Sequence, residues 1–393
     1  MAIQKPASQQ SGLPRRRFIQ DITVAGAVMY LSPGSLMSCS ARRNNTSFFA
    51  ADVDVMDQAL EMMNGLAQLT NHGPMAAEAL VALGRADKVE AFVEAYKKRF
   101  TSPYPATVKP ITQQNWREAL GDGRRVADWT NFFRTELKEA KWSQVLEKWC
   151  EILAPGLTAA AGHGLIRTGH AVRSLSVKET SWRLHELAEG LGYWAAYYQT
   201  LPEVPNPKAQ KFKPADAISR IPPLPTEIRP SNGSIMIGLR SLNDFSSFAA
   251  AADLIGVNND STRLISEMTE TFADAYVKNV TQRNFVTLIH TVTSTTAVRT
   301  LLPYLSRATA QEMLRYGWQL AAALYSISSI GSTNITPEPK EIKRDDLIDR
   351  AATLQEEHAI KFTEACLREY ALNPSPAYLQ AAHDALGRLT KPA

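Results

Sequence analysis

Histidines and one lysine in two short stretches are the residues of this chain whose types and spacing could do chemistry. His358 and Lys361 are three positions apart, and His163 and His170 are seven apart. Each pair would therefore share one face of a helix. Imidazole nitrogens bind iron, zinc, copper and nickel. We expect several of these groups to converge on one metal ion, together with two histidines in similar settings elsewhere, His72 and His290.

The surroundings of two histidines favour this interpretation. His163 lies between Gly162 and Gly164, small residues that allow close approach to the backbone. His290 lies in an apolar stretch, where an imidazole without a partner would be costly. A single histidine on a helix is nevertheless most often a partly buried, hydrogen-bonded residue. We expect that structural or exposed role for the remaining two, His185 and His383.

The elements that must position these residues are helical almost throughout. Apolar residues recur at three- and four-residue spacing, which predicts a mainly α protein built as a single large domain of packed helices. The only credible strand is Ser234–Leu239. The predicted helices, besides the one that contains His163, are Val53–Leu69, Met75–Tyr96, Asn115–Leu120, Val126–Leu137, Ser143–Leu153, Glu179–Leu201, Phe245–Ile255, Ser261–Asn279, Phe285–Leu302, Thr309–Ser326, Arg344–Tyr370 and Pro376–Leu389.

A Pro-rich connection interrupts the helices at Leu201–Pro230, which contains eight prolines and cannot be regular helix. It is a crossing segment or lid between two helical halves, or else a linker between domains. Thr101–Thr112 and Gly331–Pro339 are predicted loops. An aromatic stripe before the Pro-rich connection forms core or walls a flat aromatic substrate: Trp182, Tyr193, Trp194, Tyr197 and Tyr198.

The composition bounds the class of protein. The chain has 393 residues, of which 45% are hydrophobic, which suits a large buried core and excludes a disordered protein. Most of the net charge of +4 lies in residues 1–38. No basic tract is interleaved with aromatic residues, so a nucleic-acid partner is not expected.

The first 38 residues are predicted to form an export signal. Arg15–Arg17 followed by the apolar run Ile22–Leu31 is typical of the twin-arginine route. Leu36–Cys39 is similar to a lipobox, so we expect residues 39–393 to form the mature domain in the periplasm or cell envelope. Cys39 would be the lipid-modified first residue and the only membrane attachment; ordinary cleavage near Ser38 is the alternative.

The two other cysteines, Cys150 and Cys366, lie in separate helical runs. They could pair in an oxidising compartment, but two buried thiols are favoured. Neither cysteine has a neighbour at CxxC spacing, so a zinc knuckle or a thioredoxin-type site is not indicated.

Five short blocks of the chain, in order, resemble the questin oxidase-like family. Members of this family are oxygenases that open a ring of anthraquinone-type polyketides, and the ring-cleaving branch binds iron through four histidines and a carboxylated lysine. The resemblance spans most of the mature chain. The blocks are Asn71–Pro74, Ala79–Gly84, His163–His170, Leu288–Thr293 and Glu357–Lys361.

The resemblance implies a ligand set of His72, His163, His290 and His358, with Lys361 as the carbamate. An ordinary lysine ammonium has no lone pair, so a lysine in a metal site must be deprotonated or modified by CO2. The alternative for Lys361 is a surface lysine that pairs with Glu357 or Glu364 along its helix.

One block departs from the family pattern, because Arg167 stands where family members have a second histidine. A histidine follows three residues later, at His170. We expect both residues at the catalytic site, with His170 as a spare ligand, substrate contact or proton donor; a packed core histidine is the alternative. Glu356, Glu357 and Arg167 are expected to support the ligands, although the two glutamates could also form a solvated helix face.

The function that the resemblance implies is an exported mononuclear iron oxygenase that uses O2 on a polycyclic aromatic or quinoid substrate. NADPH is not expected, because no GxGxxG sequence opens a helix and the periplasm lacks this cofactor. A lipid-anchored binding or scaffold protein with the family fold is the alternative. A zinc hydrolase with Glu357 as general base is a third hypothesis, although the sequence has no HExxH spacing to support it.

Overall fold

The computed structural model describes residues 54–66, 70–99, 106–204, 211–230, 233–257, 260–328 and 341–390. These residues form helices joined by turns and contain no strand, which confirms the mainly α class. Two isolated β-bridges join Leu157 to Gln199 and Phe212 to Ile255. The described residues belong to one compact unit. The predicted export signal, Cys39 and the loop Gly331–Pro339 lie outside the described residues.

The first half of the unit contains eight of the described helices. They are α2 (Val55–Met63), α3 (His72–Ala82), α4 (Val89–Arg99), α5 (Trp116–Ala119), α6 (Val126–Glu139), α7 (Trp142–Leu153), α8 (His163–Val177) and α9 (Ser181–Ala196). The second half continues with α10 (Pro214–Ala217), α11 (Ile235–Ser241), α12 (Ser261–Asn279), α13 (Phe285–Leu301), α14 (Arg307–Ile327), α15 (Arg344–Leu354), α16 (Glu357–Leu372) and α17 (Pro376–Leu389). None of the described helices is long and apolar enough to cross a membrane.

Helices with strong end signals occur where the sequence predicts them. α12 begins after Asp260, whose carboxylate accepts a hydrogen bond from the Arg263 backbone N–H at 2.9 Å. α17 begins at Pro376, a residue suited to the first turn because its missing N–H is not needed there. Both helices start and end at the predicted residues, because these signals act within a few residues of the chain.

Two predicted helices are each split by a residue in the left-handed region. The run Met75–Tyr96 breaks at Gly84, with φ of 74°, which separates α3 from α4. The run Arg344–Tyr370 breaks at Gln355, with φ of 52°, which separates α15 from α16. Glycine at such a position is a common helix end. Glutamine carries no such signal, so this second break could not be read from the sequence.

The predicted strand Ser234–Leu239 is wrong. The segment forms α11, whose first turn is capped by the Ser234 hydroxyl, an acceptor for the Ile237 backbone N–H at 3.4 Å. α11 packs against α14 and buries Gly238 and Leu239. A short apolar run is compatible with either structure when periodicity alone is considered.

The Pro-rich connection, in its described parts, contains only the one-turn helix α10 and short 3-10 turns, as the prolines predict. The aromatic stripe before it contributes to the core: the Trp194 side chain is fully buried, and its indole N–H donates to the Gly156 carbonyl at 3.2 Å. Cys150 and Cys366 are free and buried, which confirms the prediction of two thiols.

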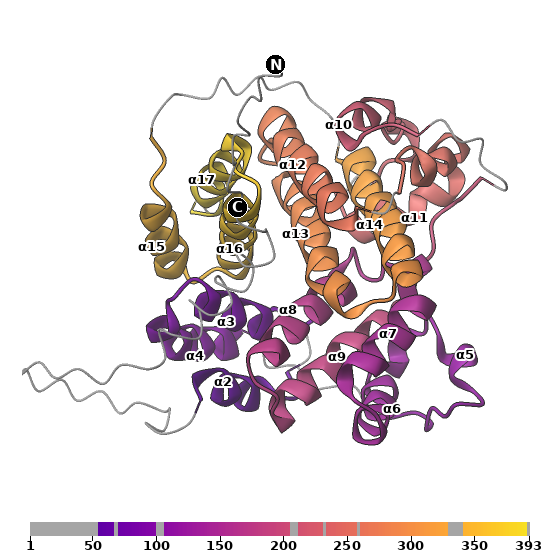
Figure 1. The fold of residues 1–393 in the computed structure, drawn as a ribbon, viewed down its shortest axis with the longest axis vertical. Helices are drawn as coiled ribbons and strands as arrows, with labels where there is room; N and C mark the ends of the chain where they lie inside the picture. Colours follow the sequence, from indigo (N-terminus) through magenta and orange to yellow (C-terminus); the bar gives the residue numbers. More distant parts are fainter. Residues whose placement is uncertain are drawn as a thin grey trace, which may run out of the picture. The chain divides into compact units, whose positions relative to one another are not determined.

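Four helices that are distant in sequence surround one centre. α3 contacts α8, α8 contacts α13, α13 contacts α16, and α16 contacts α3, which closes the ring. In the view of Figure 1, α8 lies beside the indigo α3, and the yellow α16 and the orange α13 lie above them. α9 packs on α8 from outside this ring, and α12 and α14 pack on α13. Each helix of the ring carries one of the four predicted histidine ligands.

Close packing of α8 on α9 depends on a glycine next to the first residue of α8. A Cβ atom at Gly164 would lie 2.6 Å from both Cα and Cβ of Trp194. The neighbouring atoms belong largely to the backbone and cannot rotate away. The two helices therefore approach each other only because this position lacks a side chain.

We predict that Gly164→Ala lowers the free energy of unfolding by about 1–3 kcal/mol, because the added methyl group separates α8 from α9. Gly387→Ala is the matched control: a Cβ atom there meets nothing within 4 Å, and alanine in a helix gains up to about 1 kcal/mol over glycine. Urea denaturation followed by circular dichroism measures both. Equal effects of the two substitutions would contradict this packing.

Candidate metal centre

The four predicted histidine ligands form a closed ring of imidazoles. The centroids of adjacent rings are 4.9 Å apart for His72 and His163, 4.7 Å for His163 and His290, 5.7 Å for His290 and His358, and 5.1 Å for His358 and His72. His163 Nε2 lies 3.1 Å from Nε2 of both His72 and His290. Ligand atoms of His72, His163 and His358 lie within 4.8 Å of one another. Side chains from four remote points of the chain thus meet.

The hydrogen bonds on the far side of three rings assign the tautomers. Nδ1 of His163 faces the Ala160 carbonyl oxygen at 2.5 Å, and Nδ1 of His290 faces the Val286 carbonyl oxygen at 2.7 Å. Nδ1 of His358 faces a carboxylate oxygen of Glu356 at 2.8 Å. Because these oxygens only accept, each Nδ1 carries the hydrogen, and in a neutral ring Nε2 then holds a lone pair.

The lone pairs so assigned face each other. Nε2 of His163 and Nε2 of His290 are 3.1 Å apart, and neither has a hydrogen to share. Two imidazole nitrogens bound to one ion at about 2.1 Å would lie about 3.0 Å apart at a right angle and about 3.4 Å apart at the tetrahedral angle. The observed separation fits a shared cation with ligands near right angles, and this donor set suits iron as well as other transition metals.

Burial keeps the imidazoles of His72, His163 and His290 neutral. It lowers the pKa of His163 to about 3 and the pKa values of His72 and His290 well below the ordinary value, and the nearby Lys361 adds to each decrease. His290 is only 3% exposed. Neutral imidazole is the form that binds a metal, so the site holds its nitrogens ready as ligands.

Lys361 lies at the same centre. Its side chain is buried, and Nζ takes part in none of the hydrogen bonds or ion pairs of the described residues. Burial lowers the pKa of Lys361 to about 8, although Glu357 and Glu356 oppose this decrease. The alternative of an exposed lysine paired along its helix does not describe this side chain.

The backbone is strained where three of the ligand helices begin. His72 is the first residue of α3, His163 the first of α8 and His358 the second of α16. All the non-glycine residues with positive φ in the described part of the chain immediately precede these three helices: Thr70, Asn71, Ala160, Ala161 and Gln355. Each such residue costs on the order of 1–3 kcal/mol, and strain of this kind gathers at functional sites.

Glu356 and Glu357 have different hydrogen-bond and ion-pair partners. Glu356 accepts from His358 Nδ1 with one oxygen and from the Ala359 backbone N–H with the other, at 2.7 Å. Glu357 is buried and pairs with Arg99 at 2.9 Å. Glu356 therefore has the ligand-supporting contact that the sequence predicts, while the contacts of Glu357 fix α16 to α4.

Arg167 lies in a buried ion cluster between α8 and α9. Its guanidinium donates to Glu186 at 2.7 and 2.8 Å and to Glu189 at 2.5 Å. The arginine is 2% exposed, and both carboxylates are buried. Burial raises the pKa of the Tyr96 hydroxyl. Hydrogen bonds from the backbone N–H groups of Gly73 and His72 and the positive charge of Arg167 oppose this increase. A catalytic role for Arg167 stays a prediction.

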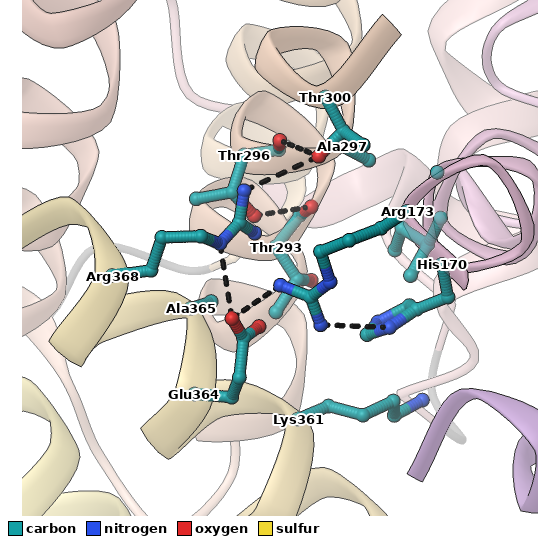
Figure 2. A pocket seen from close by; sticks show the side chains of 12 residues that line it. His170, Arg173, Thr293, Thr296, Ala297, Thr300, Lys361, Glu364, Ala365 and Arg368 are labelled. Carbon is teal, nitrogen blue, oxygen red and sulfur yellow. Dashed lines mark hydrogen bonds and ion pairs between the residues drawn. The ribbon is translucent and has the colours of Figure 1, made fainter. Parts of the chain in front are cut away.

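His170 lies beside a narrow cavity between α8, α13 and α16. Nδ1 of His170 is 2.7 Å from a carboxylate oxygen of Glu78, which also pairs with Arg173. Lys361 and Glu364 line the same cavity, which Figure 2 shows. His170 is thus a neighbour of the centre and does not belong to the group of converging ligand atoms. Its catalytic role stays a prediction.

The two histidines expected to be structural have partners away from the centre. His185 Nε2 lies 3.0 Å from Asn64 Oδ1 and 3.2 Å from a Glu189 oxygen. His383 Nδ1 lies 3.0 Å from an Arg350 nitrogen. Sequence analysis did not find Tyr96 or Glu78 at the site, because a tyrosine and a glutamate on ordinary helix faces carry no local signal.

A model of the questin oxidase-like family matches residues 69–366, about three quarters of the chain, and the match includes all four converging histidines and Lys361. The chain belongs to the questin oxidase-like family. At the level of the family, membership makes it an oxidoreductase. No curated protein matches the sequence. In this questin oxidase-like chain, groups that could hold a metal coincide with the family blocks of the sequence.

Buried ion pairs tie the ligand helices together. Glu78 on α3 pairs with Arg173 on α8, and Arg173 also pairs with Glu364 on α16. Burial raises the pKa of Glu78, but the charge of Arg173 and the hydrogen bond with His170 outweigh it, so that the pKa falls to about 2. Ionised Glu78 therefore stabilises the folded state above pH about 4.5, and this contribution is lost as the pH falls towards 2.

We predict that Glu78→Gln lowers the free energy of unfolding by roughly 2–4 kcal/mol at pH 7, because it removes a buried carboxylate from the Arg173 guanidinium and from its hydrogen bond with His170. The difference from wild type should shrink below pH 4.5 and vanish near pH 2. Urea denaturation between pH 2 and pH 7 measures it, with the exposed Glu312→Gln as control. A difference that is independent of pH would contradict the assignment.

Proposed function

We propose that this chain is a metal-dependent oxygenase, with non-haem iron as the metal, that oxidises or opens a ring of a polycyclic aromatic or anthraquinone-like substrate. Family membership supports an oxidoreductase, and the facing lone pairs of His163 and His290 support the metal. The ligands would be the imidazoles of His72, His163, His290 and His358, with Lys361 as the fifth. We keep the exported location, with Cys39 as lipid anchor, as part of this proposal.

The charge around the centre supports a carboxylated form of Lys361. Three of the ligand helices place their N-terminal ends at the site, and a helix N-terminus is the positive end of its dipole. A divalent cation surrounded by neutral imidazoles needs negative charge nearby. An ammonium group would add a further positive charge, whereas a carbamate formed from Lys361 and CO2 brings an anionic oxygen ligand.

The metal, when bound, would activate O2 for transfer to the substrate. The protein itself orients the imidazole rings and excludes water from the centre. Glu356 orients His358 through Nδ1, the Ala160 carbonyl group orients His163, and the Val286 carbonyl group orients His290. Burial excludes water from His290 and Lys361. His358, whose side chain is 20% exposed, marks the side from which a substrate would approach.

The number of imidazoles favours this function over a zinc hydrolase. A hydrolytic zinc site has three protein ligands near tetrahedral angles and an open position for water. Here four imidazoles meet, one more than such a site uses. A scaffold protein without metal would gain nothing from lone pairs that repel one another.

Metal content and O2 consumption test the proposal. We expect purified wild-type protein to hold about one equivalent of iron, and His163→Ala and His358→Ala to retain less than about a tenth of an equivalent after dialysis against a chelator. His383→Ala, at an exposed histidine, should keep the metal. Elemental analysis gives the content. An oxygen electrode with a panel of hydroxyanthraquinones should record uptake with wild type and none with His163→Ala.

Two results would count against the proposal separately. If the purified wild-type protein contained no transition metal, the proposed metal centre would be refuted. Wild-type protein that holds iron but consumes no O2 with any quinoid or polyphenolic substrate would leave a metal site without the proposed activity. Circular dichroism of each variant must match wild type, so that loss of metal is not loss of fold.

Glu356→Gln tests the support of His358. The carboxylate serves the His358 ring and the Ala359 backbone N–H with separate oxygens, and an amide has only one acceptor oxygen for the two donors. We expect the affinity for the metal to fall about 10–100-fold. Competition against a fluorescent chelator measures it, with the exposed Glu118→Gln as control. An affinity equal to that of wild type would show that Glu356 only caps α16.

A further inference from the structure

An open pocket lies outside the ring of ligand helices, between α6, α9 and the C-terminal end of α2. α9 contacts both α6 and α2, and the three helices lie in the lower part of Figure 1. The volume of the pocket is about 360 Å³, and pockets of about 300–1,000 Å³ hold small organic molecules. Neither Lys361 nor any of the four converging histidines lines it. The pocket is therefore separate from the metal centre.

Part of the lining of this pocket is apolar and aromatic. Trp182 and Leu184 of α9 and Leu137 of α6 line the pocket, and each is half-buried. The His185 ring meets the Trp182 ring edge-on, with centroids 6.2 Å apart. His185 Nε2 lies 3.0 Å from Asn64 Oδ1, and this contact fixes the imidazole in place. A half-buried indole beside two leucines offers a flat ligand an apolar surface to pack on.

The charged side chains that line the pocket are cationic. Arg134 and Lys138 lie four residues apart on α6, so they are neighbours on one face of this helix. Both are exposed, and neither takes part in a hydrogen bond or ion pair within the described part of the chain. No aspartate or glutamate among the described residues lines the pocket. Two like charges at this spacing repel each other, and an anion bound beside both would remove the repulsion.

Buried contacts fix the two long helices that form the pocket. Arg167 of α8 pairs with Glu186 and Glu189 of α9 at 2.7 and 2.5 Å. α6 packs closely on α9, since a Cβ atom at Gly192 would lie 3.0 Å from the Thr130 backbone nitrogen. A ligand would therefore order only the exposed side chains of the pocket, which limits the entropy cost of binding.

We propose that this pocket is a binding site for an aromatic carboxylate. The ring system of the ligand packs on Trp182 and the two leucines, and its carboxylate lies beside Arg134 and Lys138. A guanidinium matches a carboxylate with two parallel hydrogen bonds, and the lysine adds a second positive charge. The inference goes beyond the proposed function, because the site uses no metal ligand and no metal.

The lining distinguishes this ligand from related ones. A neutral aromatic molecule would cover the apolar part and leave both cations unpaired. An aromatic cation would be repelled by Arg134 and Lys138. An inorganic anion would pair with these two side chains and leave the apolar surface in water. Only a molecule with both a ring system and an anionic group uses the whole lining.

Titration calorimetry of the full chain with 2-naphthoate tests the site. Each titration is run on the protein as purified and on protein treated with a chelator. The ligand controls are 2-naphthamide, which has the same ring system and no charge, and acetate, which has no ring. The variant is Arg134→Gln/Lys138→Gln. Lys98→Gln/Lys141→Gln is the matched control, because both lysines are exposed, neither lines the pocket, and the net charge changes equally. Circular dichroism checks the fold of each protein.

We expect wild type to bind one equivalent of 2-naphthoate, with the same affinity before and after chelator treatment. 2-Naphthamide and acetate should each bind at least about tenfold more weakly. 2-Naphthoate should bind Arg134→Gln/Lys138→Gln about tenfold more weakly than wild type, because two solvent-exposed ion pairs are lost. Lys98→Gln/Lys141→Gln should bind it as wild type does.

The other outcomes overturn the proposal. Equal affinity of Arg134→Gln/Lys138→Gln and wild type would place the ligand elsewhere on the protein. Equal affinity for 2-naphthamide would show a pocket that selects only the ring, and equal affinity for acetate would show an anion site without an apolar part. Binding that disappears with the chelator would place the carboxylate on the metal, which refutes this site and supports the metal centre. Wild type that binds no 2-naphthoate refutes the site and leaves the proposed function untouched.

Discussion

The structure depends on one interaction: imidazole rings from four helices meet at a single place. Nε2 of His163 lies 3.1 Å from Nε2 of both His72 and His290. Without a cation the facing lone pairs of His163 and His290 repel each other, and a shared cation would remove this repulsion. The arrangement of α3, α8, α13 and α16 as a closed ring brings the imidazoles together, and the surrounding helices support this ring.

Part of the cost of bringing the rings together is backbone strain just before three of the four helices, α3, α8 and α16. Asn71, Ala161 and Gln355 hold positive φ angles that most residues avoid. Such strain persists only where the surroundings leave no alternative. The surroundings here are buried ion pairs between the same helices: Arg173 of α8 bridges to α3 and α16, and Arg299 of α13 pairs with Glu369 of α16 at 2.7 Å.

Electrostatics divides the centre into two parts. Neutral rings and helix N-termini lie on one side, where burial keeps protons away from His163. On the other side a cluster of arginines and glutamates surrounds the cavity behind Lys361. Lys361 joins the two parts, since it is close enough to the imidazoles to lower their pKa values and also lines the cavity.

The sequence by itself determined most of the helices, the histidines worth testing and, through the blocks that contain them, the family. Capping residues and apolar spacing act over a few residues, so α12 and α17 could be read directly. Only the tertiary structure decided the tautomers, the burial of Lys361 and the places of Arg167 and His170. The same was true of the break at Gln355, where a glutamine gives no sign of a helix end. These features depend on contacts between residues far apart in the chain, such as Glu78 with Arg173, and no local pattern records which distant side chains will meet.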